Sequence, residues 1–168
     1  MAHPDIPPPK NGTSEQRSAD PVRAAERICQ ERNARFTFMR RAVFEALCEA
    51  GRPLGAYDVM DRLSRVLNKP LGPTTVYRAL EFLLKHRLIA RIESRNAFVP
   101  NTDPSHRNGV FFICMHCGSA AGIADSAIEN LLRRDAAALG FEIGRQVVEL
   151  QGSCANCRDG DCGQSVTN

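Results

Sequence analysis

Four of the seven cysteines in this 168-residue chain form two pairs with the same spacing. Cys114 and Cys117 enclose two residues, as do Cys154 and Cys157, and thirty-six residues separate the pairs. Two such pairs supply four thiolates, the ligand set with which proteins hold tetrahedral Zn²⁺. Because four sulfur ligands leave no open coordination position, the site would stabilise the fold and carry out no catalysis. The spacing therefore predicts one structural Zn²⁺ per chain.

Two other chemistries are open to these cysteines. A redox dithiol usually begins a helix in a thioredoxin-like strand–helix–strand pattern, which is absent here. Disulfides between the pairs require an oxidising compartment. The N-terminus has no basic start followed by an apolar core, and no apolar run approaches the length of a membrane span. We therefore expect a cytoplasmic protein with no membrane partner.

The other three cysteines have simpler interpretations. Cys29 and Cys48 fall on apolar faces of predicted helices, so we expect both to be buried. Cys162 lies in a glycine-containing tail and is either a spare ligand or a free thiol.

The sequence before the cysteine pairs predicts a helical domain with a β-hairpin. Residues 1–21, with five prolines, have the composition of a disordered tail. Apolar residues at helical spacing then predict helices at residues 21–33, 38–50, 56–67 and 74–86, the last capped by Thr74. Two β-like runs follow, at residues 88–93 and 97–99, around a short polar turn. This order is the plan of a winged helix-turn-helix domain, which we assign to residues 22–99.

The remaining sequence predicts a small α/β unit. A hinge loop at residues 100–109 precedes a strand at 110–113, a helix at 126–139 and a strand at 141–150. Four apolar residues of this helix are expected to be buried: Ile128, Leu131, Leu132 and Leu139. The unit, residues 110–158, is too small to bury its faces alone, so we expect it to pair with a second copy as a dimerisation domain. Residues 159–168 are expected to form a flexible tail.

The expected fold class is thus α+β: an N-terminal winged helix-turn-helix domain followed by a small α/β dimerisation domain with a four-cysteine zinc site.

The charges are unevenly distributed along the chain. Residues 32–95 carry 13 basic and 6 acidic groups, a net charge of +7, whereas residues 96–168 have a net charge of −3. A basic module of this kind favours a polyanion such as DNA, and in a winged helix the last helix before the hairpin enters the major groove. The solvent side of that helix would carry Thr74, Thr75, Tyr77, Arg78 and Lys85, which suit phosphate and base-edge contacts. The alternative is a helical bundle with a polar surface.

Enzymatic function is not expected. The sequence contains no Gly-rich phosphate loop, no nucleophile elbow and no HExxH motif, and the predicted metal site is coordinatively closed. Two classes remain: a DNA-binding transcriptional regulator, and a zinc-stabilised protein-interaction module without DNA binding.

The predicted recognition helix carries a family signature. Residues 74–80 read Thr-Thr-Val-Tyr-Arg-Ala-Leu and resemble the recognition helix of the ferric uptake regulator family. Residues 35–40 occupy the place of that family's start motif, with Phe38 where a proline is usual, and the two cysteine pairs match its structural zinc site. Three segments, at 56–58, 79–83 and 92–98, are most similar to the zinc uptake regulator branch. The resemblance covers about residues 24–158.

The resemblance implies a homodimeric bacterial regulator that binds an operator in double-stranded DNA and responds to metal. In this branch it implies a repressor of zinc uptake genes. Regulatory metal would bind between the two domains and set the angle of the winged helices. By motif position, Tyr77 would contact thymine methyls or phosphate, Arg78 would contact guanine or phosphate, and Tyr57 would contact the DNA backbone.

The regulatory metal site departs from the pattern of the branch. The branch usually supplies four ligands, and the matching positions here are Ala90, Asn101, His106 and Gly122. Only His106 keeps a strong metal ligand. One hypothesis is a second, regulatory Zn²⁺ held by His106 with some of Glu93, Asp103, His116 or Asp125. Another is a regulator of this family whose metal-sensing site is lost or altered. A third is that the match to the pattern is shifted by a residue or two in the loop, so that His86 or ligands of the tail take part.

Overall fold

The structure is a computed structural model that describes residues 20–101, 109–144, 146–158 and 160. The chain divides into two compact units, residues 1–35 and 36–168. In the first unit, helix α1 (Pro21–Glu31) begins where the Asp20 carboxylate accepts a hydrogen bond from the Val22 N–H at 3.0 Å. Pro21 occupies the first helical position, where its missing N–H costs nothing. Cys29 is buried, as predicted.

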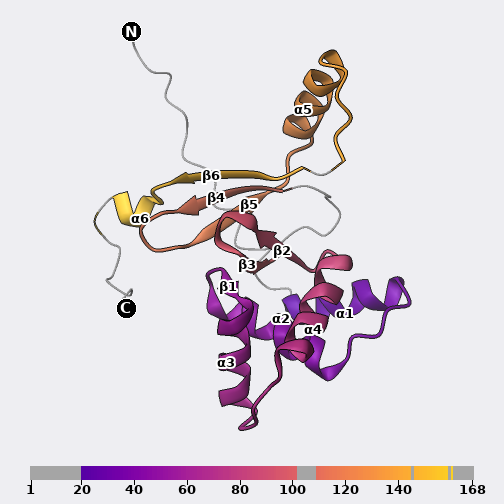
Figure 1. Cartoon of the computed structure of the whole chain (residues 1–168), viewed down its shortest axis with the longest axis vertical. Helices are drawn as coiled ribbons and strands as arrows, with labels where there is room; N and C mark the ends of the chain where they lie inside the picture. Colours follow the sequence, from indigo (N-terminus) through magenta and orange to yellow (C-terminus); the bar gives the residue numbers. More distant parts are fainter. Residues whose placement is uncertain (1–19, 102–108, 145, 159, 161–168) are drawn as a thin grey trace. The chain divides into compact units, whose positions relative to one another are not determined.

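Three helices of the second unit pack on one another: α2 (Phe38–Ala50), α3 (Ala56–Val66) and α4 (Pro73–Lys85) (Figure 1). Several leucines and valines of these helices are fully buried, Leu47 and Leu83 among them. Helix α2 ends at Gly51, whose φ of 63° lies in the left-handed region that favours glycine. The prediction that Thr74 caps α4 is wrong. The helix begins one residue earlier because Pro73, with its fixed φ, takes the first position and Gly72 becomes the cap.

A three-stranded antiparallel sheet follows, which we call the wing sheet. Strands β2 (Ile89–Ile92) and β3 (Ala97–Pro100) form the predicted hairpin, and β1 (Leu54–Gly55) adds to β3 to give the order β1-β3-β2. The turn of the hairpin is a 3-10 helix, η2 (Glu93–Arg95), closed by Asn96 in the left-handed conformation with φ 47°. The two-residue strand β1 was not expected from the sequence.

A second sheet, which we call the cysteine sheet, has the strand order β5-β4-β6. Strand β4 (Val110–Cys114) lies between β5 (Ala120–Ile123), which is antiparallel to it, and β6 (Val148–Gly152), which is parallel to it. A short helix, α6 (Ala155–Arg158), follows β6. The prediction of a strand over residues 141–150 is wrong for its first part, because residues 141–144 form no strand.

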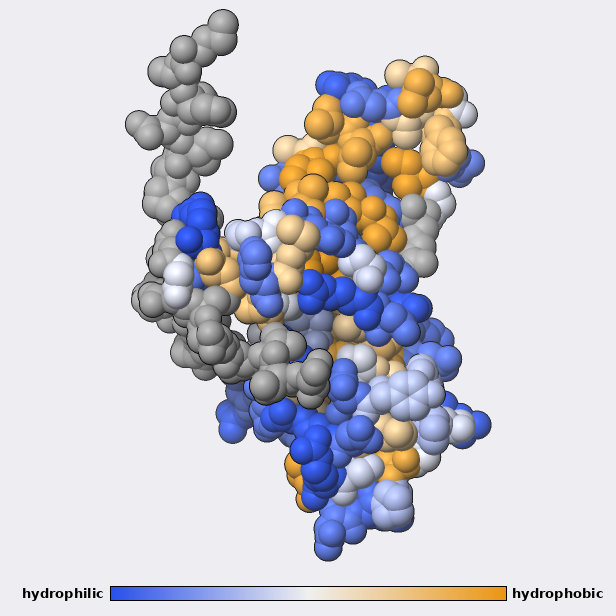
Figure 2. Space-filling view, turned by 60° about the vertical axis from the view of Figure 1, so that its left-hand side comes forward, coloured by the Kyte–Doolittle hydropathy of each residue, from blue (hydrophilic) through white to orange (hydrophobic). Residues whose placement is uncertain are grey.

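Helix α5 (Ser126–Ala138) lies between β5 and β6 in the chain and is capped by Asp125, whose carboxylate accepts from the Ala127 N–H at 2.7 Å. In the single chain, the prediction that the apolar residues of this helix are buried is wrong. Leu131 is 47% exposed and Leu139 is 84% exposed, and no described α5 residue is buried. Ile128 and Leu132 are only half-buried. Figure 2 shows the resulting apolar surface in the part of the molecule that carries α5. Within the described residues, no helix combines the length and apolar character needed to cross a bilayer.

Candidate metal centre and nucleic-acid interface

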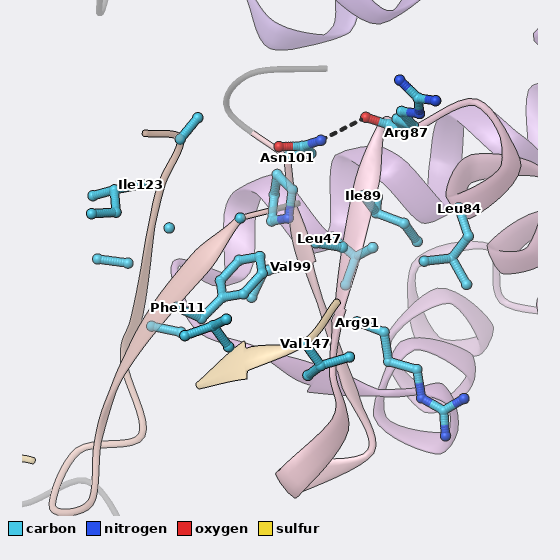
Figure 3. A pocket seen from close by; sticks show the side chains of 18 of the residues that line it. Leu47, Leu84, Arg87, Ile89, Arg91, Val99, Asn101, Phe111, Ile123 and Val147 are labelled. Atoms are coloured by element: carbon cyan, nitrogen blue, oxygen red, sulfur yellow. Dashed lines mark hydrogen bonds between the residues drawn. The ribbon is translucent and has the colours of Figure 1, made fainter. Parts of the chain in front are cut away.

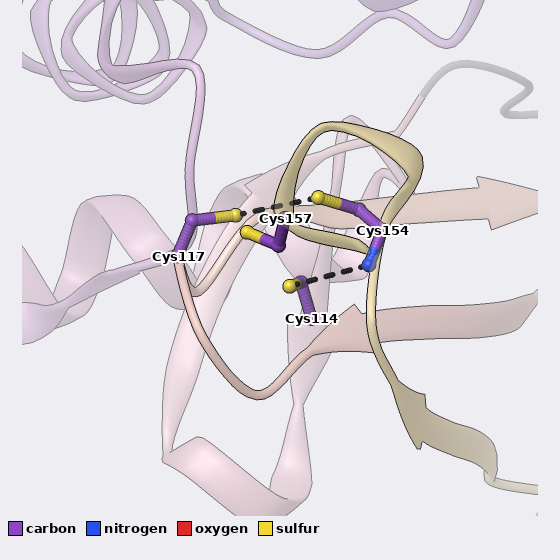
Figure 4. Close-up of side chains that lie close together, drawn as sticks. All are labelled: Cys114, Cys117, Cys154 and Cys157. Atoms are coloured by element: carbon purple, nitrogen blue, oxygen red, sulfur yellow. Dashed lines mark hydrogen bonds between the residues drawn. The ribbon is translucent and has the colours of Figure 1, made fainter. Parts of the chain in front are cut away.

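The ends of strands β4 and β6 bring the four paired cysteines together. Because the two strands are parallel, with Cys114 opposite Gly152, both cysteine pairs follow at the same edge of the sheet. The Met115 N–H continues the ladder by donating to the Gly152 carbonyl at 2.8 Å. The four sulfur atoms all lie within 4.8 Å of one another (Figure 4). The pairing of β4 with β6 thus brings together two cysteine pairs that lie far apart in the sequence.

The arrangement of the sulfurs fits a tetrahedral zinc ion. With Zn–S bonds of about 2.3 Å, a tetrahedron has edges of about 3.8 Å. The Cys117 and Cys154 sulfurs lie 3.8 Å apart. Cys114 is buried and the other three cysteines are half-buried, so the protein encloses the site from one side. Four thiolates fill the coordination sphere, which is the property of a structural site.

Backbone hydrogen bonds favour the thiolate form of one of these sulfurs. The N–H groups of Cys117 and Cys154 lower the pKa of Cys114 to about 6, although burial opposes them. The Cys157 N–H acts in the same direction on Cys154, but burial and the neighbouring Cys114 and Cys117 sulfurs outweigh it, so the pKa of Cys154 is raised. Several thiolates this close repel one another, and a divalent cation removes that repulsion.

The other chemistries considered for these cysteines are not supported. Cys114, Cys117 and Cys154 are free thiols, so the two disulfides between the pairs are not formed. The first pair lies in a turn after a strand and not at the start of a helix. His116, inside that pair, is exposed, and its Nε2 lies 2.9 Å from the Ser153 hydroxyl. The four-cysteine cluster is the one group of three or more metal-ligating side chains found among the described residues.

Helix α4 presents a polar face of the kind predicted for DNA contacts. Thr74, Thr75, Tyr77 and Arg78 are all exposed, and so is Lys85. The opposite side of the helix is buried through four apolar residues, Val76, Ala79, Leu80 and Leu83. Tyr57 is 64% exposed near the start of α3. The burial pattern therefore leaves hydroxyl, phenol and guanidinium groups available to a partner.

The sequence of the described fold matches a known family. A family model described as the ferric uptake regulator family matches residues 31–151, which is most of the chain. The chain belongs to the ferric uptake regulator family. This is a family of transcriptional regulators, so the chain is not an enzyme.

Relatives in this family match about four fifths of this chain. The zinc uptake regulation protein of Escherichia coli K12 is 35% identical over 136 residues, which are 79% of this chain and 78% of that protein. A zinc uptake regulator complexed with zinc and DNA has a TM-score of 0.76 at 32% identity, covering 84% of this chain and 95% of that one. The structure of holo XcZur gives 0.74 at 39% identity, covering 82% and 96%.

A cavity of about 610 Å³ lies between the wing sheet and the cysteine sheet (Figure 3). Its wall includes Ala90, Asn101 and Gly122, three of the four positions matched to regulatory ligands of the zinc uptake regulator branch. The structure therefore brings these positions together, but Ala90 and Gly122 offer no ligand atom. The Asn101 side chain donates to the Arg87 carbonyl at 3.0 Å. These three residues do not fit a regulatory zinc ion.

The remaining candidates for the regulatory metal are only partly described. Glu93 belongs to η2 and its carboxylate lies 3.4 Å from the Arg91 guanidinium. His106 and Asp103 lie outside the described residues, as does Cys162. Cys48 is half-buried where burial was expected, because it lines the cavity.

Two contacts between the sheets have no counterpart among the predictions from the sequence. Glu149 of β6 and Arg95 of η2 join the wing sheet to the cysteine sheet through hydrogen bonds. Both are ordinary charged residues in sequence, and no local pattern distinguishes them from solvated surface charges. Only the pairing of β4 with β6 reveals which groups they meet.

Proposed function

We propose that this chain is a metal-responsive transcriptional regulator that binds specific operator DNA as a homodimer and represses zinc uptake genes in the cytoplasm. The domain organisation we propose is a winged-helix domain at residues 22–99, a hinge at 100–109 and a dimerisation domain at 110–158. One structural Zn²⁺ per chain is held by Cys114, Cys117, Cys154 and Cys157.

The observation that carries this proposal is the exposed polar face of α4 beside the wing sheet. In a winged helix-turn-helix domain, the helix before the hairpin reads the major groove. Tyr77 and Arg78 are both exposed there, and a guanidinium suits guanine edges and phosphates. A likeness to a zinc uptake regulator described as complexed with zinc and DNA supports the same role.

The homodimer is supported by the uncovered apolar surface of the C-terminal part. Phe112, Leu131 and Leu150 are each between 46% and 48% exposed, and Leu139 is more exposed still. Exposed apolar side chains in this number mark an interaction surface. A second copy would cover them and place two α4 helices for successive half-sites.

The test is DNA binding by the zinc-loaded chain. Fluorescence anisotropy would compare a labelled fragment from upstream of a zinc uptake operon with a scrambled fragment of equal length. We expect preference for the operator fragment, and we expect Arg78→Ala to lose about 1–3 kcal/mol of affinity while keeping its zinc. Arg134→Ala is the matched control, since this exposed arginine lies on α5 and makes its ion pair with neighbouring Asp135. Equal binding of both fragments, or an unaffected Arg78→Ala variant, would refute the proposal.

A second candidate is a regulator of the same family with a lost or altered metal-sensing site. The observation that favours it is the cavity wall, where Ala90 and Gly122 carry no ligand atoms. Zinc content before and after dialysis against a mild chelator separates the two. A fall from two ions per chain to one supports a labile regulatory site. One ion throughout supports the second candidate.

A further inference from the structure

The turn at the tip of the wing hairpin has backbone donors that its own hairpin does not satisfy. The turn consists of η2 (Glu93–Arg95) and Asn96. The first N–H groups of any helix have no partner within the helix. Here they are the N–H groups of Glu93 and Ser94, and no side chain of the turn caps them.

Glu149 of β6 supplies the missing acceptor from 55 residues away in the chain. One carboxylate oxygen accepts from the Glu93 N–H at 2.6 Å, and the other accepts from the Ser94 N–H at 3.1 Å. Although partial burial opposes ionisation, hydrogen bonds from Ser94 and Glu93 hold the pKa of the carboxyl below its ordinary value. A carboxylate on the cysteine sheet thus caps a helix in the wing.

Arg95, from the same turn, reaches the first cysteine pair. Its guanidinium donates to the Cys114 carbonyl at 3.0 Å, and the Gly118 N–H donates to that carbonyl at 3.1 Å. A Cβ on Gly118 would lie 3.0 Å from the Arg95 guanidinium, so the arginine lies directly against the turn that carries Cys117. This contact depends on the shape of the metal-binding turn.

Apolar packing lies behind these polar contacts. Ile92 and Val99 of the wing sheet form a buried cluster with Ile113 of β4. The wing therefore contacts the cysteine sheet through a small apolar core, through Glu149 on β6 and through Arg95 on the cysteine turn. Neither charged residue belongs to α4.

We propose that Arg95 and Glu149 form a clasp that fixes the wing, and with it α4, in the orientation that binds DNA, and that the clasp closes only when the four-cysteine site is filled. The two residues are positioning residues. The inference rests on the proposed DNA-binding function. The physical reason is that Arg95 bonds to the backbone of a metal ligand, so a change in the shape of this turn when the ion leaves also removes the partner of Arg95. When the clasp is open, α4 adopts several orientations, of which one binds DNA. The apparent affinity then falls in proportion to the fraction of molecules in that orientation.

The direction in which DNA affinity changes when Glu149 is substituted distinguishes the clasp from a purely electrostatic effect. Removing a negative charge from a DNA-binding protein should strengthen binding to a polyanion. The clasp predicts the opposite for Glu149→Gln, because the amide has one acceptor oxygen for two N–H donors. Glu142→Gln is the matched control, since Glu142 is exposed in the segment before β6.

The experiment measures operator affinity of the full-length, zinc-loaded chain by fluorescence anisotropy over a range of salt concentrations. We expect Glu149→Gln and Arg95→Ala each to bind about tenfold more weakly, with unchanged zinc content and dimer mass, while Glu142→Gln binds equally or slightly better. The slope of the logarithm of affinity against the logarithm of salt concentration should be the same for Arg95→Ala and the wild type. A slope lower by about one would mean that Arg95 contacts a phosphate directly, which would overturn its role in the clasp. Equal or tighter binding by Glu149→Gln, with the wild type binding normally, would overturn the clasp as a whole.

Hydrogen exchange keeps the proposal testable if a variant fails to fold. In the wild-type chain, the amides of Glu93 and Ser94 should be protected with zinc and should exchange at least tenfold faster after chelation. Protection that survives chelation would overturn the coupling to the metal. Absence of operator binding by the wild type would instead contradict the proposed function and leave these amide measurements as the test of the clasp.

Discussion

The ring of Phe111 lies across Gly122, its register partner on β5, so closely that a Cβ on Gly122 would sit 2.9 Å from Cε1 of the ring. Both residues line the cavity between the two sheets. The aromatic ring therefore occupies space that a side chain at position 122 would need. A larger residue at position 122, a metal-ligating one included, would therefore require the ring of Phe111 to shift.

The first prediction concerns this pair. Gly122→Ala should lower the free energy of unfolding by about 1–3 kcal/mol, because the ring must leave its position to admit a methyl group. Chemical denaturation at fixed protein concentration measures the change. Gly144→Ala is the control, since nothing lies within 4 Å of a Cβ there. Adding Phe111→Leu to Gly122→Ala should recover part of the loss, and equal stability of all variants would contradict the steric explanation.

The second prediction concerns the four-cysteine site. Cys154→Ser leaves three thiolates and should reduce bound zinc from one ion per chain to well below one. Because a structural zinc site contributes folding free energy, the melting temperature should fall as well. Metal analysis after gel filtration checks the first outcome and calorimetry the second. Cys48→Ser, outside the cluster, should keep its zinc. Unchanged zinc in Cys154→Ser would refute the ligand assignment.

The third prediction concerns the salt dependence of DNA binding. Contacts to phosphates release counterions, so the logarithm of the affinity should fall linearly with the logarithm of salt concentration. If Arg78 contacts a phosphate, Arg78→Ala should reduce that slope by about one. If it contacts a base edge, the slope should stay the same while discrimination between operators falls. A flat salt dependence in the wild type would argue against phosphate contacts by the basic module.

The fourth prediction concerns acid stability. The pKa of Glu149 is held below its ordinary value of 4.5 in the folded chain. Such a carboxyl stabilises the fold above its unfolded pKa, and the contribution is lost as pH falls through the folded pKa. The stability difference between wild type and Glu149→Gln should therefore be constant above about pH 5 and shrink below it. Denaturation curves at each pH test this, with zinc content measured at each pH so that only zinc-loaded samples of the two proteins are compared. A difference that persists unchanged to about pH 3 would contradict it.

The sequence allowed the parts with strong local signals to be predicted. Helical spacing and Gly51 defined α2, and two identical cysteine spacings defined the metal ligands, because both signals are local and chemically restrictive. Strand β5, with the sequence Ala-Ala-Gly-Ile, has no alternation to reveal it. Its existence depends on pairing with β4, a tertiary contact.

Burial on α5 could not be predicted for a different reason. The spacing of the apolar residues predicts one apolar face on this helix, but the pattern does not say whether the chain itself covers that face, and Leu131 and Leu139 are exposed in the single chain. Three of the positions matched to regulatory ligands line one cavity, which the resemblance alone does not establish. The packing of Phe111 on Gly122 follows from strand register, which sequence spacing alone does not provide.

The parallel pairing of β4 with β6 has a consequence for how the chain tolerates a break. A zinc ion at the end of these strands closes a loop over residues 118–153, and α5, with none of its described residues buried, lies within that loop. The ion is a cross-link made of coordination bonds. A single protease cut in α5 should leave two fragments that migrate together under native conditions. A chelator should weaken their association, and a reductant that breaks disulfides should not.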